Sequence, residues 1–333
     1  MFILLVTFLL SFVVCFILTK YLIVYFQNNN IVAFDLHKKN KPLLANSGGI
    51  PVVLSLIVGL MFFIGSKTFF LNDQTKLLDL FAAALTILLI SIIGFFDDLN
   101  SSNILKGKDK IRKGLKQWQK PLLTLFAAIP LMVIKAGYSS LTLPLIGSVN
   151  FGIIYPLILV PLGVVFVANS VNMLGGFNGS EAGMGLVYTI SLGLFALKHG
   201  ETVSAVIFIS TAGALLAFLK YNWIPAKILP GDSLTYGLGS VVASGVIIGN
   251  MEKAGMIVMI PFILEFFLKF RSKFSAQCLG KLKKDNSLEP PYGKKIYSWT
   301  HVIMNLGRLN EKQVSLALIL LELMFCVTIF ILF

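Results

Sequence analysis

Runs of apolar residues recur along the whole chain at lengths that suit helices crossing a membrane. A helix of about 20 residues spans the hydrocarbon core of a bilayer, and ten apolar segments of roughly this kind can be marked in the sequence. The pattern therefore predicts an all-α, polytopic integral membrane protein with about ten transmembrane helices in a single domain, 1–333. The predicted segments are 2–26, 50–66, 77–96, 121–137, 149–170, 184–198, 203–219, 233–250, 255–270 and 313–333.

The composition excludes a soluble globular protein. Of the 333 residues, 56% are apolar and only 13% are charged, whereas soluble domains carry about 25% charged residues. The first apolar segment lacks a basic start and a small-residue cleavage site, so we expect a retained helix and not a signal peptide. The cysteines Cys15, Cys278 and Cys326 are widely spaced, which predicts neither a disulfide framework nor a zinc site.

The positive charges fall mainly on alternate loops. The chain has 28 Lys and Arg against 15 Asp and Glu, a net charge of +13, and 21 of the 28 lie in the odd-numbered loops. Because cytoplasmic loops collect basic residues, we expect these loops in the cytoplasm and both termini on the extracytoplasmic side. The charges either set orientation alone or also attract anionic lipids or phosphorylated substrates; nucleic acid is not an expected partner. The predicted cytoplasmic loops are 27–49, 97–120, 171–183, 220–232 and 271–312.

Two adjacent carboxylates, Asp97 and Asp98, end the third apolar segment in the stretch GFFDDLN. Such neighbours repel each other at a membrane boundary unless a cation, a basic side chain or a proton separates their charges. They either begin a solvated loop, help to hold a hard cation or act as a base. Seven basic residues follow, Lys120 being the last, and could offset the carboxylates or bind a phosphate.

A stretch rich in asparagine and glycine, NSVNMLGGFNGSEAG, follows the fifth apolar segment. Asn169 and Asn172 are three residues apart and are expected to share a helix face, and Asn178 follows in the loop. Amide oxygens beside the bare backbone of Gly176 and its neighbouring glycines suit close contact with a ligand. The same glycines could instead only break a helix.

Two further motifs carry weaker signals. Asp232 follows Pro230 and Gly231 at the start of an apolar segment, so it is either a helix N-cap or, near a divalent cation, a metal ligand. Gly48 and Gly49 precede a predicted helix, where their backbone N–H groups could face an anion. The lysines just before them could instead be simply solvated.

Several polar residues are left outside the predicted site. His37, His199 and His301 are scattered along the chain and predict no histidine metal cluster. Glu265 lies inside an apolar segment and is expected to pair with a neighbouring helix. Lys269 is expected to extend its ammonium group toward the interface.

The motifs together resemble one family, the polyprenyl-phosphate N-acetylhexosamine-1-phosphate transferases. GFFDD, NSVNMLGGFNGSEAG and NWIPAKILPGDS occur in that family's order, and FDLHKKNKP followed by SGGIP resembles its first cytoplasmic loop. The stretch NMLGGFNGSEAG is most similar to the branch that makes N-acetylglucosaminyl-diphosphodolichol. The resemblance implies transfer of GlcNAc-1-phosphate from UDP-GlcNAc to dolichyl phosphate with release of UMP, the first step of lipid-linked glycan assembly for protein N-glycosylation.

The resemblance also implies roles for the matched residues. Asn172 and Asp232 match the residues that hold magnesium, or manganese in its place, on the diphosphate. Asp97 and Asp98 match the family's paired aspartates, and Lys120 resembles its lysine near the phosphates. The residues expected to contact the substrates, by motif or by location, are Gly48, Gly49, Asn169, Gly176, Asn178, Arg271, Lys273 and Gln277.

One stretch departs from the family. Gly176 and Asn178 match its uridine pocket, but its eukaryotic members begin the last loop with an HR-containing motif that contacts the diphosphate and the sugar. Here RSKFSAQCLGKLKK stands at that place, so Arg271, Lys273 and Gln277 substitute for the motif by location only.

The implied partners are UDP-GlcNAc, a polyprenyl or dolichyl phosphate and membrane lipids, with a homodimer as an open alternative to a monomer. We expect the cell membrane, with the active site on the cytoplasmic face, or the endoplasmic reticulum membrane in a eukaryote. The main alternative is a membrane transporter of an anionic or phosphorylated solute, which would share the charge asymmetry and broken helices. Transporters bind near the bilayer midplane, whereas these polar motifs end segments on one face, which favours the enzyme.

Overall fold

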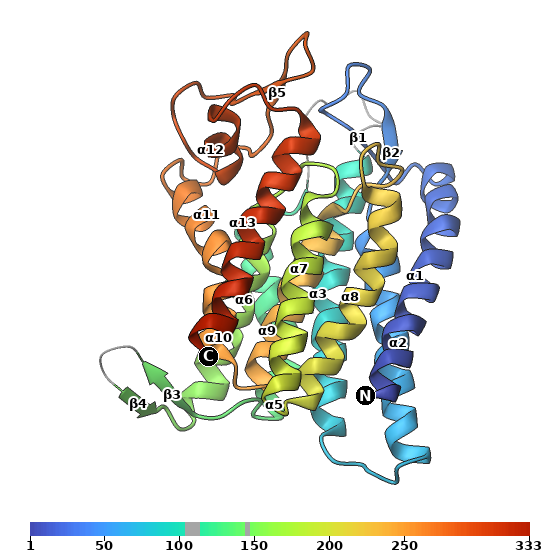
Figure 1. The fold of residues 1–333 in the computed structure, drawn as a ribbon, viewed down its shortest axis with the longest axis vertical. Helices are drawn as coiled ribbons and strands as arrows, with labels where there is room; N and C mark the ends of the chain where they lie inside the picture. Colours follow the sequence, from blue (N-terminus) through green and yellow to red (C-terminus); the bar gives the residue numbers. More distant parts are fainter. Residues whose placement is uncertain (104–113, 144–146) are drawn as a thin grey trace.

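The computed structural model describes residues 1–103, 114–143 and 147–333. Its helices run mostly alongside one another as a bundle (Figure 1). The longer helices are Phe2–Asn28 (α1), Gly49–Phe69 (α2), Leu77–Asn103 (α3), Ser180–Lys198 (α7), Thr202–Asn222 (α8), Gly231–Ile248 (α9) and Glu311–Leu332 (α13). The shorter ones are Gln119–Ala127 (α4), Ile129–Val133 (α5), Val160–Val171 (α6), Glu252–Val258 (α10), Ile260–Phe270 (α11) and Trp299–Asn305 (α12).

Each predicted apolar segment contains a helix or a pair of short helices. Within the described residues, six helices are long and apolar enough to cross a membrane: α1, α2, α3, α7, α8 and α13. This confirms a helical, polytopic membrane protein. The count of about ten spans stays a prediction.

Three of the predicted segments are interrupted by prolines. Helix α4 gives way to α5 at Ala128, α10 gives way to α11 at Met259, and a π-helical turn, Tyr155–Leu159, leads into α6. Pro130 and Pro261 each stand in the first turn of the second helix of their pair. Proline has no N–H to donate but is tolerated in a first turn, so each proline ends one helix and starts another.

The loops contain short strands that the all-α prediction missed. Three antiparallel two-stranded sheets form within the described residues, each between segments close in sequence. They pair Val32–Phe34 (β1) with Leu43–Ala45 (β2), Ser140–Leu143 (β3) with Gly147–Asn150 (β4), and Lys281–Leu282 (β5) with Leu288–Glu289 (β6).

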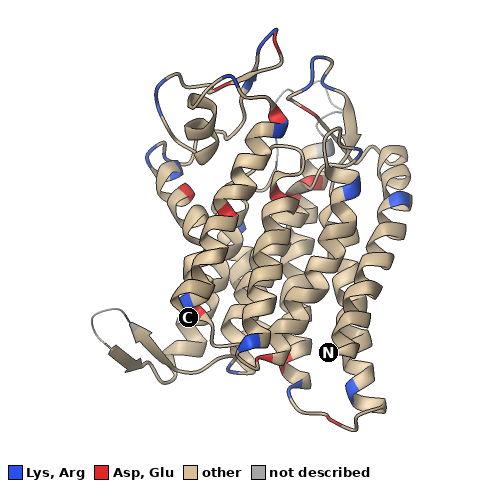
Figure 2. Ribbon diagram, in the orientation of Figure 1, with Lys and Arg blue, Asp and Glu red and all other residues tan. Residues whose placement is uncertain are grey.

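The two ends of the bundle differ in charge. The β1–β2 and β5–β6 loops lie at one end, and both chain termini lie toward the other (Figure 1). Basic residues gather on the loops at the first end, with fewer at the second (Figure 2). The predicted cytoplasmic loops therefore meet at one end of the molecule.

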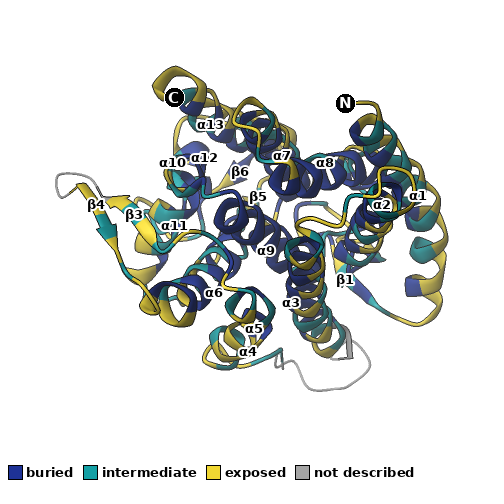
Figure 3. Ribbon diagram, turned by 90° about the horizontal axis from the view of Figure 1, so that it is seen from below, coloured by how far each residue is buried: buried dark blue, intermediate teal, exposed yellow. Residues whose placement is uncertain are grey.

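Helix α9 forms the centre of the bundle. Every residue from Ser233 to Ile248 is buried, and seen along the bundle α9 is surrounded by other helices, with exposed residues on the outside (Figure 3). Small residues allow this close packing. A Cβ atom added at Gly239 would lie 2.5 Å from the Cα of Ala168 on α6.

The first turn of α9 is packed equally closely against α2 and α3. A Cβ atom at Gly49 would lie 2.1 Å from the backbone nitrogen of Leu234, and one at Gly94 would lie 2.4 Å from the carbonyl oxygen of Asp232. Neither position has room for a side chain. Three helices therefore converge at Asp232.

This packing predicts different effects for two glycines of the same helix. Gly49→Ala forces backbone apart, so we expect it to reduce the free energy of unfolding by about 1–3 kcal/mol. Gly65→Ala is the matched control, because its Cβ atom would meet nothing within 4 Å, and it should be neutral or stabilising. Melting temperatures of the two variants in detergent test this, and equal values would contradict the close approach of α2 and α9.

Candidate active site

A cavity of about 1220 Å³ opens at the end of the bundle that carries the β1–β2 loop. Its walls come from α3, α4, α6, the start of α9 and the loops on either side of them. It brings together most of the predicted site. The predicted residues that line it are Asp97, Asp98, Lys120, Asn169, Asn172, Gly176, Asn178, Asp232 and Gln277.

An ion-pair cluster lies at the centre of this cavity. The ammonium group of Lys120 lies 2.7 Å from Asp97 Oδ2 and 2.9 Å from Asp232 Oδ2. Burial alone would lower the pKa of Lys120, but the carboxylates of Asp232 and Asp97 outweigh burial and raise it. Lys120 therefore carries a fixed positive charge between α3 and α9.

Asp98 has a different environment from Asp97. Its carboxylate accepts the backbone N–H groups of Asp232, at 2.7 Å, and of Ser233, at 3.1 Å. It thus binds N–H groups at the N-terminus of α9 that have no acceptor within the helix, where a negative charge is also favoured by the helix dipole. Gly231, with a positive φ of 69°, leaves room for it. We conclude that Asp98 positions Asp232.

Asn169 on α6 and Asn172, the residue that follows α6, both contact α9 next to this cluster, as their three-residue spacing predicts. Asn172 Oδ1 accepts the Thr235 hydroxyl at 2.6 Å, and Asn169 Oδ1 accepts the Tyr236 hydroxyl at 3.3 Å. The Tyr236 ring centre also lies 5.6 Å from the Lys120 nitrogen. Residues from four helices thus surround a single charged centre.

The glycine-rich loop is held by carboxylates. The N–H of Gly176 donates to Glu181 at 2.6 Å, and Gly176 has a positive φ of 95°, which glycine adopts readily. The side-chain amide of Asn178 donates to Asp35 at 2.9 Å. Lys38 forms an ion pair with Glu311 at the start of α13.

Sequence reasoning missed this group of contacts. His37, which we did not assign to the site, stacks on Phe177 with ring centres 4.4 Å apart and accepts the N–H of Gly280 at 3.2 Å. Asp35 lines the cavity, although it was not among the candidates. The signal for these contacts in the sequence is the stretch FDLHK, in which an aspartate and a histidine precede the lysines. This stretch is interpreted as a basic loop when only its lysines are considered.

The expected anion contact of Gly48 and Gly49 is wrong. Their N–H groups already donate to the carbonyls of Leu229 and Pro230, each at 3.0 Å. A Cβ atom at either position would lie less than 2.5 Å from neighbouring atoms. These glycines serve packing and do not expose backbone to a ligand.

Of the three residues predicted in the last loop, Gln277 lines the cavity and the other two do not. Arg271 and Lys273 are exposed and do not line the cavity; the guanidinium of Arg271 lies over the ring of Tyr297. Lys269, expected to reach the interface, is buried, lines the cavity and donates to the carbonyl of Ala276 at 2.8 Å. Five basic residues of the loop 97–120 lie outside the described residues: Lys106, Lys108, Lys110, Arg112 and Lys113.

Cys278 also lines the cavity. Its thiol donates to the carbonyl of Met173 at 2.9 Å. Burial and the nearby Glu265 carboxylate raise the pKa of this thiol, so it stays protonated at neutral pH. It is therefore no candidate for a nucleophile.

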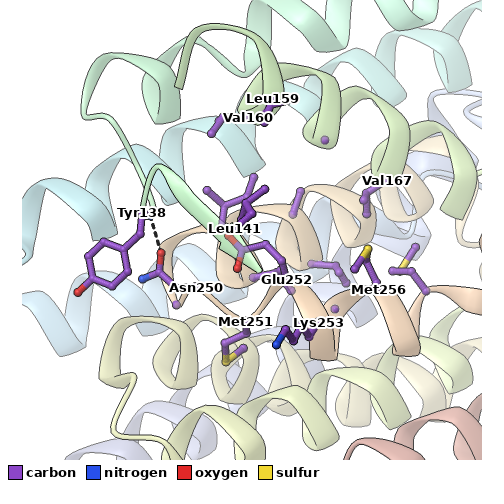
Figure 4. A pocket seen from close by; sticks show the side chains of 18 of the residues that line it. Tyr138, Leu141, Leu159, Val160, Val167, Asn250, Met251, Glu252, Lys253 and Met256 are labelled. Atoms are coloured by element: carbon purple, nitrogen blue, oxygen red, sulfur yellow. Dashed lines mark hydrogen bonds between the residues drawn. The ribbon is translucent and has the colours of Figure 1, made fainter. Parts of the chain in front are cut away.

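A second cavity, of about 850 Å³, lies toward the other end of the bundle and has mostly apolar walls (Figure 4). The Tyr155 hydroxyl donates to Glu252 there at 2.7 Å, and the Tyr138 N–H donates to Asn250 at 2.5 Å. None of the predicted site residues lines it. The charged cavity is therefore the candidate active site.

The charged cavity fits a divalent cation that binds together with a phosphate. Within the described residues, no three His, Cys, Asp or Glu side chains are grouped so that they could hold a metal ion. Magnesium, however, usually binds through one or two carboxylates together with substrate phosphates. Asp232, whose side chain is 30% exposed, and the Asn172 amide beside it are suitable ligands for such a site.

Comparison with known proteins shows to which family this chain belongs. The model of glycosyl transferase family 4 matches residues 80–250. The chain belongs to this family. The matched residues run from α3 to α9 and include the charged cluster. As a member of family 4, the chain is a membrane glycosyl-1-phosphate transferase.

Similarity to individual proteins agrees with the assignment to family 4. A Saccharolobus solfataricus protein, provisionally named UDP-N-acetylglucosamine–dolichyl-phosphate N-acetylglucosaminephosphotransferase, is 34% identical over 96% of this chain and 93% of its own length. A Dictyostelium discoideum protein with that enzyme name is 27% identical over 71% of this chain and 64% of its own. A phospho-N-acetylmuramoyl-pentapeptide-transferase of Clostridium perfringens is 28% identical over 70% of each chain.

The geometry predicts that substitutions of the two paired aspartates differ in their effect on stability. Asp98→Ala leaves two buried N–H groups of α9 without their acceptor, each costing about 1–3 kcal/mol, so both the melting temperature and the transferase activity should fall. Asp97→Ala leaves a single N–H, that of Leu115, without its acceptor and leaves Lys120 paired with Asp232, so it should lower activity with a smaller loss of stability. Thermal unfolding measured beside activity tests the distinction, and equal destabilisation by both variants would contradict it.

Proposed function

We propose that this family 4 member transfers GlcNAc-1-phosphate from UDP-GlcNAc to dolichyl phosphate or a related polyprenyl phosphate. The products are GlcNAc-diphospho-polyprenol and UMP, the first step of lipid-linked glycan assembly for protein N-glycosylation. The observation that carries the proposal is the Lys120 ammonium group, bridged by Asp97 and Asp232 in a cavity of about 1220 Å³. The names of the relatives that cover nearly the whole chain support the sugar and the lipid.

The reaction brings together several negative charges, and the cavity is built to neutralise them. An acceptor phosphate oxygen bonds to the β-phosphorus of UDP-GlcNAc, the bond from that phosphorus to the bridging oxygen breaks, and UMP leaves with the electron pair. Lys120 is fixed where this charge gathers, so it stabilises the transition state without reorganising. Asp97 is the candidate acceptor for a proton on the lipid phosphate, because Asp98 is bound to the start of α9.

Asp232 and Asn172 are the residues we propose to hold Mg²⁺, or Mn²⁺ in its place. When bound, the ion would neutralise diphosphate charge and orient its oxygens. Among the described side chains, the ammonium group of Lys120 pairs with two carboxylates, Asp97 and Asp232. This excess of negative charge favours a divalent cation.

We place the charged cavity on the cytoplasmic face of the cell membrane. The basic loops gather at the cavity's end of the bundle (Figure 2), as expected for loops retained in the cytoplasm. UDP-sugars would then enter from the aqueous side, and the polyprenyl chain would remain in the bilayer beside the helices.

A transfer assay tests the proposal against the alternative of a transporter. Purified protein is mixed with polyprenyl phosphate, Mg²⁺ and radiolabelled UDP-GlcNAc, and the organic phase is counted while UMP is measured. We expect lipid-extractable label and UMP in equal amounts. Label that enters proteoliposomes without any transfer to lipid would favour the transporter.

Removal of the proposed metal ligand should abolish the metal-dependent reaction. Asp232→Ala is expected to lower transfer by at least about 100-fold, because it removes a carboxylate from both the ion and Lys120. Asp285→Ala, at an exposed carboxylate of the last loop, is the control and should retain wild-type turnover. Magnesium titration of both variants checks this, and an unchanged Mg²⁺ response of Asp232→Ala would overturn the ligand role.

The role of Lys120 can be separated from the general basic charge of its segment. Lys120→Met should reduce turnover by about 100-fold or more, since no other described ammonium group bridges Asp97 and Asp232. Lys116→Met removes an exposed lysine that lines the same cavity but forms no ion pair with Asp97 or Asp232 among the described residues, and it should alter turnover less than about threefold at moderate salt. Steady-state kinetics of the two variants measure the difference, and equal losses would show that only net charge matters.

A further inference from the structure

Asn178 is fixed on both its backbone and its side chain by segments far away in the sequence. Its N–H donates to Glu311 at 3.1 Å, and its carbonyl accepts the Ser315 hydroxyl at 3.0 Å. Its side-chain amide donates to Asp35 at 2.9 Å. Helix α13 therefore holds the backbone of Asn178, and the segment after β1 holds the side chain.

The hydrogen bond to Asp35 determines which way the Asn178 amide faces. A carboxylate can only accept hydrogen bonds, so the amide must turn its NH₂ group toward Asp35. The amide oxygen then accepts no hydrogen bond within the described residues. Because Asn178 lines the cavity, this oxygen is available there as an acceptor for a ligand.

The wall around Asn178 suits a flat group, because its two carboxylates are already engaged: Asp35 accepts the Asn178 amide, and Glu181 accepts the Gly176 N–H. Leu36, Phe177 and Leu279 line the cavity beside it, together with the bare backbone of Gly176. A Cβ atom added at Gly176 would lie 2.7 Å from the Leu279 side chain, so this wall is narrow. Within the described residues, Asn178 bonds to Asp35, Glu311 and Ser315, whereas Lys120 bonds to Asp97 and Asp232, so the two groups use different partners.

We propose that Asp35 is a positioning residue that makes Asn178 select uracil over cytosine; this rests on the proposed use of a UDP-sugar. Uracil carries a donor, N3–H, where cytosine carries an acceptor at N3. An amide oxygen held toward the base pairs with the uracil donor and meets the cytosine acceptor with repulsion. If the Asn178 amide were turned over, its NH₂ group would instead donate a hydrogen bond to cytosine N3.

Asp35 is itself held in place. It is buried, and the ammonium group of Lys38 lies 3.8 Å from its Oδ2 atom while pairing with Glu311. Glu311 in turn holds the Asn178 backbone. Asp35, Glu311 and Lys38 thus form one network, and this network fixes the orientation of the Asn178 amide.

Nucleotide binding by the full-length protein in detergent with Mg²⁺ tests this proposal. Dissociation constants for UMP and CMP are measured by titration calorimetry for the wild type, Asp35→Ala and Asp35→Asn, with Asp285→Ala as the exposed control. We expect the wild type and Asp285→Ala to prefer UMP by about tenfold or more. Asp35→Ala should reduce this preference to about threefold or less by weakening UMP and strengthening CMP.

Asp35→Asn separates positioning from direct contact. Its side-chain oxygen can still accept the Asn178 NH₂ group, so it should restore the preference for UMP. Loss of the preference in Asp35→Asn, or an unchanged preference in Asp35→Ala, would overturn the proposal. Melting temperatures show whether each variant is folded, and a preference ratio is insensitive to a partly unfolded fraction.

Failure of this proposal and failure of the proposed function give different results. A wild type that transfers GlcNAc-1-phosphate but binds UMP and CMP alike would overturn base selection by Asn178 and leave the activity standing. A wild type that prefers UMP but performs no transfer would overturn the proposed reaction and leave base selection standing.

Discussion

The carboxylate of Asp98 at the first turn of α9 is the contact on which the rest of the site depends. It accepts two backbone N–H groups there, at 2.7 and 3.1 Å, and so fixes the start of α9 against the end of α3. Asp97 is the preceding residue, so the same contact fixes its carboxylate on Lys120, which also reaches Asp232. Gly94 makes the approach possible, because any side chain there would meet the Asp232 backbone.

Burial of these charges is unfavourable unless each finds a partner, since moving an ion out of water costs several kcal/mol. The three carboxylates are compensated unequally. Asp98 has backbone N–H groups and a helix N-terminus, and Asp97 has Lys120 and the Leu115 N–H. Within the described residues, the Asp232 carboxylate has Lys120 alone as its cationic partner, and it shares that lysine with Asp97. The least compensated carboxylate is thus the one best suited to attract a cation and, with it, the phosphates of a substrate.

The sequence predicts residue types at the site better than it predicts their contacts. The motifs around Asp97, Asn172 and Asp232 could be identified because their chemistry is local, and the apolar pattern located the helices. The free N–H groups expected at Gly49 and its neighbour have partners about 180 residues away, which no local pattern reveals. The hydrogen bond from Asn178 to Asp35 likewise joins distant segments. The short sheets were missed because each is only two to four residues long.

The cavity combines two kinds of interaction that could not replace each other. Charges around Lys120 act over several ångströms and stabilise any diphosphate, so they can promote the reaction but cannot distinguish one nucleotide base from another. A hydrogen bond in a narrow wall acts only at contact, and a mismatched acceptor leaves buried polar groups unpaired. Asn178 stands on a separate loop, fixed by α13 and the segment after β1, and its partners are not those of Lys120. Recognition and catalysis can therefore be arranged independently in one cavity.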